Sequence, residues 1–170
     1  MKITFKIKGF TLVEMILYVS VCAVFLLALS SLFSFLVGSR VRSQAITEVN
    51  QQGFLVMNSI TRTIRNGRSI ENPVMAATSS LLSITTSNPI LNPTVFSIAS
   101  GTMRITEGSK GAVPLTNSRV VLSNLVFQNI SSASSTEKIV RISFIIDSVN
   151  QSGRSEYAFS KTFSGSATLR

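Results

Sequence analysis

The longest feature of the hydrophobic pattern is an uncharged stretch that runs from Met15 to Ser39. Apolar side chains fall on every face of a helix drawn through it, and only small residues such as serine interrupt them. A helix in a soluble core normally keeps one polar stripe, so the pattern favours lipid over a protein interior. Because about 20 helical residues cross a bilayer core of roughly 30 Å, the stretch predicts a transmembrane helix.

Beyond this stretch the pattern becomes that of an amphipathic helix. Asn66 and Gly67 are typical of a helix end, and Pro73 follows soon after. We therefore predict one helix over residues 10–66, with a transmembrane half at 10–39 and an amphipathic half within 40–67. At 1.5 Å per residue this helix would rise about 85 Å, too long for a globule of this size to enclose. Its predicted buried stripe recurs every three or four positions, at Ile46, Val49, Gly53, Val56, Ile60 and Ile64.

The remaining residues, 68–170, carry the alternating apolar and polar positions of β-strands. Ser100 and Gly101 are expected to turn one hairpin, and residues 150–153 another, while Lys161 interrupts the apolar face of the last strand. Because the residues from Val41 onward suffice for one small core, we predict an α+β protein whose long helix packs on one antiparallel β-sheet. The predicted strands are 81–85, 94–99, 102–106, 119–130, 140–147 and 156–163.

The composition excludes several kinds of catalytic chemistry. The chain has no histidine and a single cysteine, Cys22, so a histidine-dependent triad, a dithiol centre and the common zinc sites cannot form. Asp147, Asn150 and Glu156 are the grouping that could be considered for calcium, but the acids are sparse and their spacing matches no EF-hand. We therefore expect a protein that is not an enzyme and holds no cofactor.

The residues before the helix carry positive charge and no acid. Lys2, Lys6 and Lys8 mark an end that stays in the cytoplasm. The apolar stretch is not followed by the Ala-x-Ala site of an ordinary secretory signal. Instead, Gly9 separates the lysines from a Phe-Thr-Leu-Val-Glu string that ends at Glu14.

The string from Lys8 to Glu14 resembles the processing site of type IV pilins and of the pseudopilins of type II secretion and competence systems. The resemblance covers about the first 40 residues. It implies that residues 1–9 are a leader, that prepilin peptidase cuts after Gly9, and that Phe10 becomes the N-methylated first residue. It also implies a role for Glu14 in filament assembly.

The same resemblance implies partners and a location. The partners would be prepilin peptidase, other pilin or pseudopilin subunits, an inner-membrane assembly platform and the lipid bilayer. The chain would cross the cytoplasmic membrane once, with its N-terminus cytoplasmic and its C-terminal domain outside. It would then join an extracellular or periplasmic filament.

Glu14 also stands out on physical grounds alone. An ionised carboxylate among Val13, Met15 and Ile16 would cost several kcal/mol at bilayer depth without a compensating partner. Cleavage after Gly9 would supply a cationic amine one helical turn away, in the same chain or in a neighbouring subunit. The alternative is that Glu14 lies at headgroup level and is simply solvated.

Two departures from the family pattern point to a minor subunit. Many major pilins have a proline within the membrane helix and a disulfide near the C-terminus. This chain has no proline before Pro73 and no second cysteine to pair with Cys22. A minor pseudopilin, present in few copies, therefore fits better than a major filament protein.

Basic residues outnumber acidic ones by 16 to 7, but part of this excess belongs to the expected leader. Losing the three lysines of residues 1–9 lowers the net charge from +9 to +6. Arg62, Arg65 and Arg68 recur every three residues and could form an anion-binding ridge, which leaves a DNA-binding competence pilin as an alternative. Cations near a helix C-terminus are also favoured by the helix dipole, and we prefer this reading, with nucleic acid not expected as a partner. A further alternative is an uncleaved single-pass anchor for a β domain.

Overall fold

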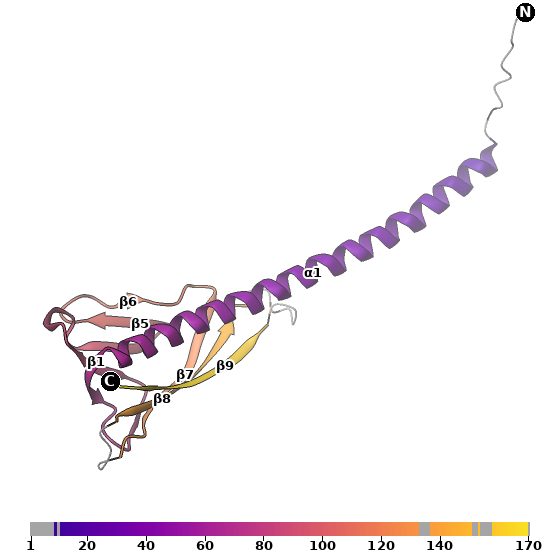
Figure 1. Cartoon of the computed structure of the whole chain (residues 1–170). Coiled ribbons are helices and arrows are strands. Elements are labelled where there is room, and N and C mark those ends of the chain that lie inside the picture. Colours follow the sequence, from indigo (N-terminus) through magenta and orange to yellow (C-terminus); the bar gives the residue numbers. More distant parts are fainter. Residues whose placement is uncertain (1–8, 10, 133–136, 151–152, 154–157, 170) are drawn as a thin grey trace, which may run out of the picture. The chain divides into compact units, whose positions relative to one another are not determined.

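The computed structural model describes residue 9 and residues 11–132, 137–150, 153 and 158–169. The chain divides into two compact units, Met1–Arg40 and Val41–Arg170, which are described separately. One helix, α1 (Leu12–Arg65), contributes its first part to the first unit and its second part to the other (Figure 1). All strands belong to the second unit.

The first unit consists mainly of the beginning of α1. Its apolar side chains are exposed on all faces, and Val13, Leu27 and Phe35 keep 72%, 72% and 73% of their surface. The helix is long and apolar enough to cross a membrane, and none of its most apolar window is buried. The length and composition of the first unit therefore fit a single membrane anchor.

The second part of α1 buries the predicted stripe in the second unit. Val49, Gly53, Val56, Ile60 and Ile64 are buried, while Ile46 is half-buried. The helix is therefore amphipathic where the sequence predicted it to be.

The helix ends within one residue of the predicted position, but Gly67 does not cap it as the sequence predicted. The helix ends at Arg65, and Asn66 N donates to Arg62 O at 3.1 Å. Gly67 begins strand β1 (Gly67–Asn72) and does not have the positive φ of a glycine cap. A Cβ at Gly67 would lie 2.6 Å from Ile84 Cγ2, so close packing between helix end and sheet explains this glycine.

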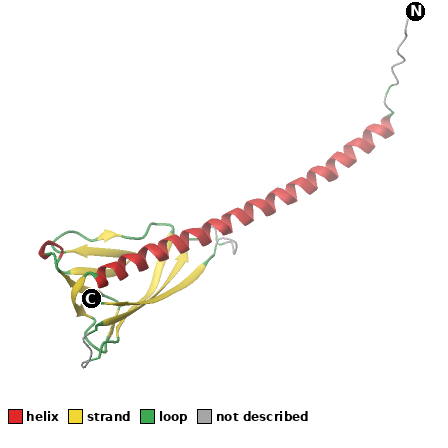
Figure 2. Ribbon diagram, in the orientation of Figure 1, coloured by secondary structure: helices red, strands yellow, loops and turns green. Residues whose placement is uncertain are grey.

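The strands form two antiparallel sheets, where the sequence predicted one (Figure 2). The five-stranded sheet has the order β1-β3-β4-β5-β6 and the four-stranded sheet the order β2-β7-β8-β9. A short 3-10 helix, η1 (Pro89–Leu91), connects β3 to β4. The strands are β1 (Gly67–Asn72), β2 (Thr78–Ser79), β3 (Leu82–Thr86), β4 (Thr94–Ala99), β5 (Thr102–Glu107), β6 (Val113–Pro114), β7 (Val120–Asn129), β8 (Ile139–Ser148) and β9 (Ser160–Thr168).

Most predicted strands are present within one or two residues. The hairpin of β4 and β5 turns at Ser100 and Gly101, whose φ angles are 51° and 71°. The last strand differs, because β9 runs from Ser160 to Thr168 and continues well past Phe163. Most of residues 150–157, where the second turn and the start of this strand were predicted, lie outside the described residues.

The core of the second unit lies between α1 and the inner faces of the sheets. On β8, Val140, Ile142, Phe144 and Ile146 are fully or almost fully buried, as their alternation predicts. Phe163 of β9 stacks on Phe144 with ring centroids 5.5 Å apart. This aromatic pair anchors the four-stranded sheet beneath the helix.

Candidate functional site

The candidate site in the first unit starts at Gly9. This residue is exposed and precedes α1, and Phe10 lies outside the described residues. A Cβ added at Gly9 would meet no atom of the described residues within 4 Å, and the φ angle of Gly9 is not in the left-handed region. Neither space nor backbone conformation therefore requires a glycine at this position.

Thr11 caps the helix that follows. Met15 N donates to Thr11 O at 3.2 Å, and Glu14 N donates to Thr11 Oγ1 at 3.3 Å. The Thr-x-x-Glu spacing is the sequence signature of a capping box, a signal that our sequence analysis missed. This cap sets the helix start and so places Glu14 in the first turn, where the helix dipole favours negative charge.

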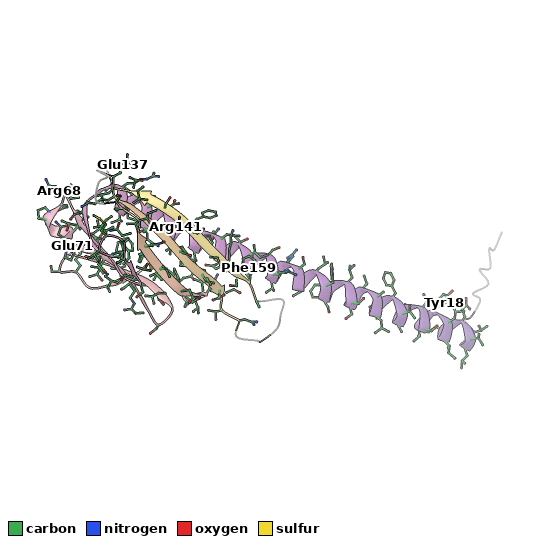
Figure 3. All side chains as sticks on the ribbon, turned by 90° about the horizontal axis from the view of Figure 1, so that it is seen from below. Tyr18, Arg68, Glu71, Glu137, Arg141 and Phe159 are labelled. Carbon is green, nitrogen blue, oxygen red and sulfur yellow. The ribbon has the colours of Figure 1, made fainter. Side chains whose placement is uncertain are left out.

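Tyr18 is a second residue that the sequence analysis missed. Tyr18 lies one helical turn further along (labelled in Figure 3), and its hydroxyl donates to Glu14 Oε1 at 3.3 Å. The spacing of four residues is the one at which helical side chains meet, so it could have been recognised from the sequence. Glu14 is half-buried, whereas its neighbours Val13 and Met15 are exposed. The carboxylate is thus oriented along the helix by a side chain of the same chain.

The three arginines are not one ridge. Arg62 and Arg65, both exposed, line an open depression of about 560 Å³ with Asn58, Thr61 and Asn66. Arg68 lies on β1 and does not line this depression. The expected ridge of three is therefore a pair of arginines with polar neighbours and a separate third arginine.

The residues considered for calcium do not form a centre in the described part of the chain. No group of three or more His, Cys, Asp or Glu side chains comes together among these residues. Asp147 accepts a hydrogen bond from Ser123 Oγ at 3.5 Å, and Glu156 lies outside the described residues. Asp147 is thus engaged with a neighbouring strand.

Comparison of this chain with protein-family models, with curated proteins and with solved structures finds no match. A function therefore has to be argued from the helix, its cap and the residues around Glu14.

Proposed function

We propose that this chain is a minor pilin-like, or pseudopilin, structural subunit of a type IV pilus or a type II secretion filament. The observation that carries the proposal is the junction from Gly9 to Glu14. It combines an exposed glycine that the fold does not require with a capped apolar helix. Glu14 is the one charged residue between Lys8 and Arg40.

Processing at this junction would follow from its accessibility. Gly9 lies outside the helix, so a peptidase can bind the chain there in an extended form without unwinding α1. A glycine also leaves the main chain uncovered on both sides. Prepilin peptidase would cut after Gly9 and methylate the new amino group of Phe10.

Glu14 would then supply the contact that drives assembly. Its Oε1 accepts a hydrogen bond from the Tyr18 hydroxyl. Its Oε2 would accept one from the cationic amino group of Phe10 in an adjacent subunit. In lipid, a lone carboxylate costs several kcal/mol, and pairing it with an amine offsets much of that cost. A buried polar pair of this kind also fixes axial register between packed helices.

The remaining partners follow from this role. The apolar part of α1 would lie in the bilayer before assembly, with its N-terminal end in the cytoplasm. It would pack against helices of other pilin or pseudopilin subunits afterwards, after extraction by an inner-membrane assembly platform. The chain would perform no catalysis of its own.

The decisive test of processing is the mass of the mature N-terminus. In cells with an active prepilin peptidase, we expect a chain that begins with N-methylated Phe10. Gly9→Leu should abolish cleavage, because a branched side chain would cover the main chain at the cut. Gly38→Leu is the matched control, since a Cβ at Gly38 also meets no atom within 4 Å and this residue is far from the cut in sequence. Intact chains beginning at Met1 would contradict the proposal and leave the uncleaved anchor as the better function.

Assembly is tested by replacing the carboxylate. Glu14→Val should leave the subunit processed and membrane-bound but reduce its recovery in sheared filaments at least ten-fold, because the inter-subunit ion pair is lost. Glu107→Gln is the control, because this half-buried acid of the second unit serves no assembly role in the proposal; its Oε2 lies 3.9 Å from Lys110 Nζ. Equal recovery of Glu14→Val and the unaltered chain would remove Glu14 from the mechanism.

One observation favours a second candidate function, DNA binding. Arg62 and Arg65 share one depression with three uncharged polar side chains, which suits a phosphate. Duplex DNA should then bind the chain in detergent micelles with a steep salt dependence, and Arg62→Gln with Arg65→Gln should reduce it. Salt-insensitive or absent binding would exclude this candidate.

A further inference from the structure

The free edge of β9 differs from the other three sheet edges in the described part of the chain. β2 and β6 have two residues each, and β6 includes Pro114. β1 is interrupted by two register shifts. β9 is nine residues long, contains no proline and pairs with β8 without a shift. Short strands, prolines and bulges are among the devices that protect sheet edges from pairing, and β9 has none of these three. Its one charged residue, Lys161, donates a hydrogen bond to Asn50 of the helix.

The hydrogen-bond pattern identifies the groups that β9 leaves free. At its two ends, Ser148 N donates to Phe159 O and Leu169 N donates to Lys138 O, both at 2.8 Å. The register between these pairs is continuous. In an antiparallel pair the main-chain groups alternate in direction, so the N–H and C=O groups of every odd-numbered residue of β9 point toward β8. The even-numbered residues therefore direct their N–H and C=O groups outward, and no partner within the described residues takes them. These residues are Ser160, Thr162, Ser164, Ser166 and Thr168.

The surroundings of the edge carry positive charge and one exposed aromatic ring. Lys161 Nζ donates a hydrogen bond to Asn50 Oδ1 at 2.7 Å. The same atom lies 6.0 Å from the ring centroid of Phe54, and Phe54 is 59% exposed. On the opposite face, Arg141 is exposed and pairs in register with Ser166. Two acids lie at the ends of the edge: Asp147, opposite Ser160 and hydrogen-bonded by Ser123, and exposed Glu137, which precedes the Lys138 that pairs with Leu169. Cations thus flank the edge on both faces.

We propose that β9 binds an extended acidic segment of a protein partner, which joins the four-stranded sheet as a fifth strand. The edge offers about 30 Å of regular strand, the length of a segment of about nine residues. Main-chain hydrogen bonds to the even-numbered residues supply affinity, and carboxylates opposite Lys161 and Arg141 supply selectivity. Phe54 offers an apolar contact at the helix side. Figure 1 shows β9 in yellow, and Figure 3 labels Arg141 on the neighbouring strand.

The probe for this site is a labelled nine-residue peptide of alternating threonine and valine with glutamate at two positions. We expect it to bind the full chain in detergent micelles, whether or not residues 1–9 have been removed. Ser164→Pro deletes one outward N–H without touching the bonds to β8, and proline is tolerated at such an edge. It should weaken binding about five-fold or more. Ser164→Ala, which keeps the N–H, should bind as the unaltered chain does.

A second measurement keeps the test valid if Ser164→Pro fails to fold. The same peptide, N-methylated at alternate residues, should not bind the unaltered chain, and a peptide with lysine for glutamate should bind more weakly. Binding should also slow amide hydrogen exchange at the even-numbered residues of β9 selectively. Absence of binding, equal binding to Ser164→Pro, or equal binding of the lysine peptide would overturn the proposal. A concentration-dependent dimer that Ser164→Pro abolishes would do so as well, by identifying a second copy as the occupant. None of these results depends on cleavage or filament assembly.

Discussion

At the scale of single residues, Gly53 shows how one small side chain allows the helix to approach the sheet. A Cβ at this position would lie 2.1 Å from Phe163 Cζ, well inside contact distance. The Phe163 ring has little room to move, because it stacks on Phe144 and meets Phe54 edge-on at 6.0 Å. A glycine in mid-helix lowers helix propensity, and the close contact with the aromatic ring explains why it is present.

We predict that Gly53→Ala destabilises the second unit. Helix propensity alone would favour alanine by about 1 kcal/mol, but overpacking against a confined ring typically costs about 1–3 kcal/mol. The free energy of unfolding from urea denaturation in micelles should therefore fall. Gly111→Ala is the control, because a Cβ there meets nothing within 4 Å, and it should change stability by less than about 0.5 kcal/mol. A Gly53→Ala chain as stable as the unaltered one would show that the ring moves aside freely.

At the scale of elements, the edge strand β1 is fastened to β3 by a side chain. The sequence of β1, Gly-Arg-Ser-Ile-Glu-Asn, has little β-propensity, and its pairing with β3 is irregular. Glu71 of β1, labelled in Figure 3, accepts hydrogen bonds from the hydroxyls of Thr85 and Ser83. These bonds, that of Thr85 foremost, lower the pKa of Glu71 below its ordinary value of 4.5. The ionised carboxylate therefore stabilises the pairing of β1 with β3.

This lowered pKa predicts a pH dependence with a definite sign. Because folding favours the ionised form, the contribution of Glu71 is fully present above about pH 4.5 and is lost as pH falls through the lower, folded-state pKa. Glu71→Gln should reduce the fall in thermal stability between neutral pH and pH 3. Thr85→Val, which removes the main donor, should act in the same direction. If thermal stability fell between neutral pH and pH 3 as much in both variants as in the unaltered chain, this assignment would be contradicted.

At the scale of the whole molecule, the chain separates a membrane-capable unit from a unit with a core. In the described part of the chain, every buried core side chain lies between Val49 and Ala167, within the second unit. Among its described residues, the first unit buries no large apolar side chain and leaves its helix exposed. The stability of the second unit should therefore come from its own packing.

We predict that a chain beginning at Val41 is soluble and folded without the first unit. It should remain in the supernatant without detergent, show mixed α and β circular dichroism, and unfold in one cooperative transition. The full chain should stay in the membrane fraction when membranes are washed with alkaline carbonate. Insolubility or a non-cooperative melt of the shortened chain would show that the core needs residues 1–40.

Much of the fold could be predicted from local patterns. The single long helix, the stripe from Val49 to Ile64 and the alternation on β8 were confirmed, although the helix runs over Leu12–Arg65 and not over the predicted 10–66. The strands β1, β2 and β6 were not predicted, because they are short or poor in β-branched residues. They form strands because neighbouring strands pair with them. In the candidate site, Gly9 and Glu14 were singled out from the sequence, while Thr11 and Tyr18 were missed despite readable spacings.

The sequence by itself determined the features that depend on neighbours along the chain. These are the uncharged helix, its amphipathic continuation, the hairpin at Ser100 and Gly101, and the position of Glu14 in an apolar run. Only the tertiary structure decided the division into two sheets, the contact of Gly53 with Phe163 and the unpaired edge of β9. The physical reason is that periodicity reports which side of an element is apolar, whereas pairing and close approach depend on residues far apart in the chain.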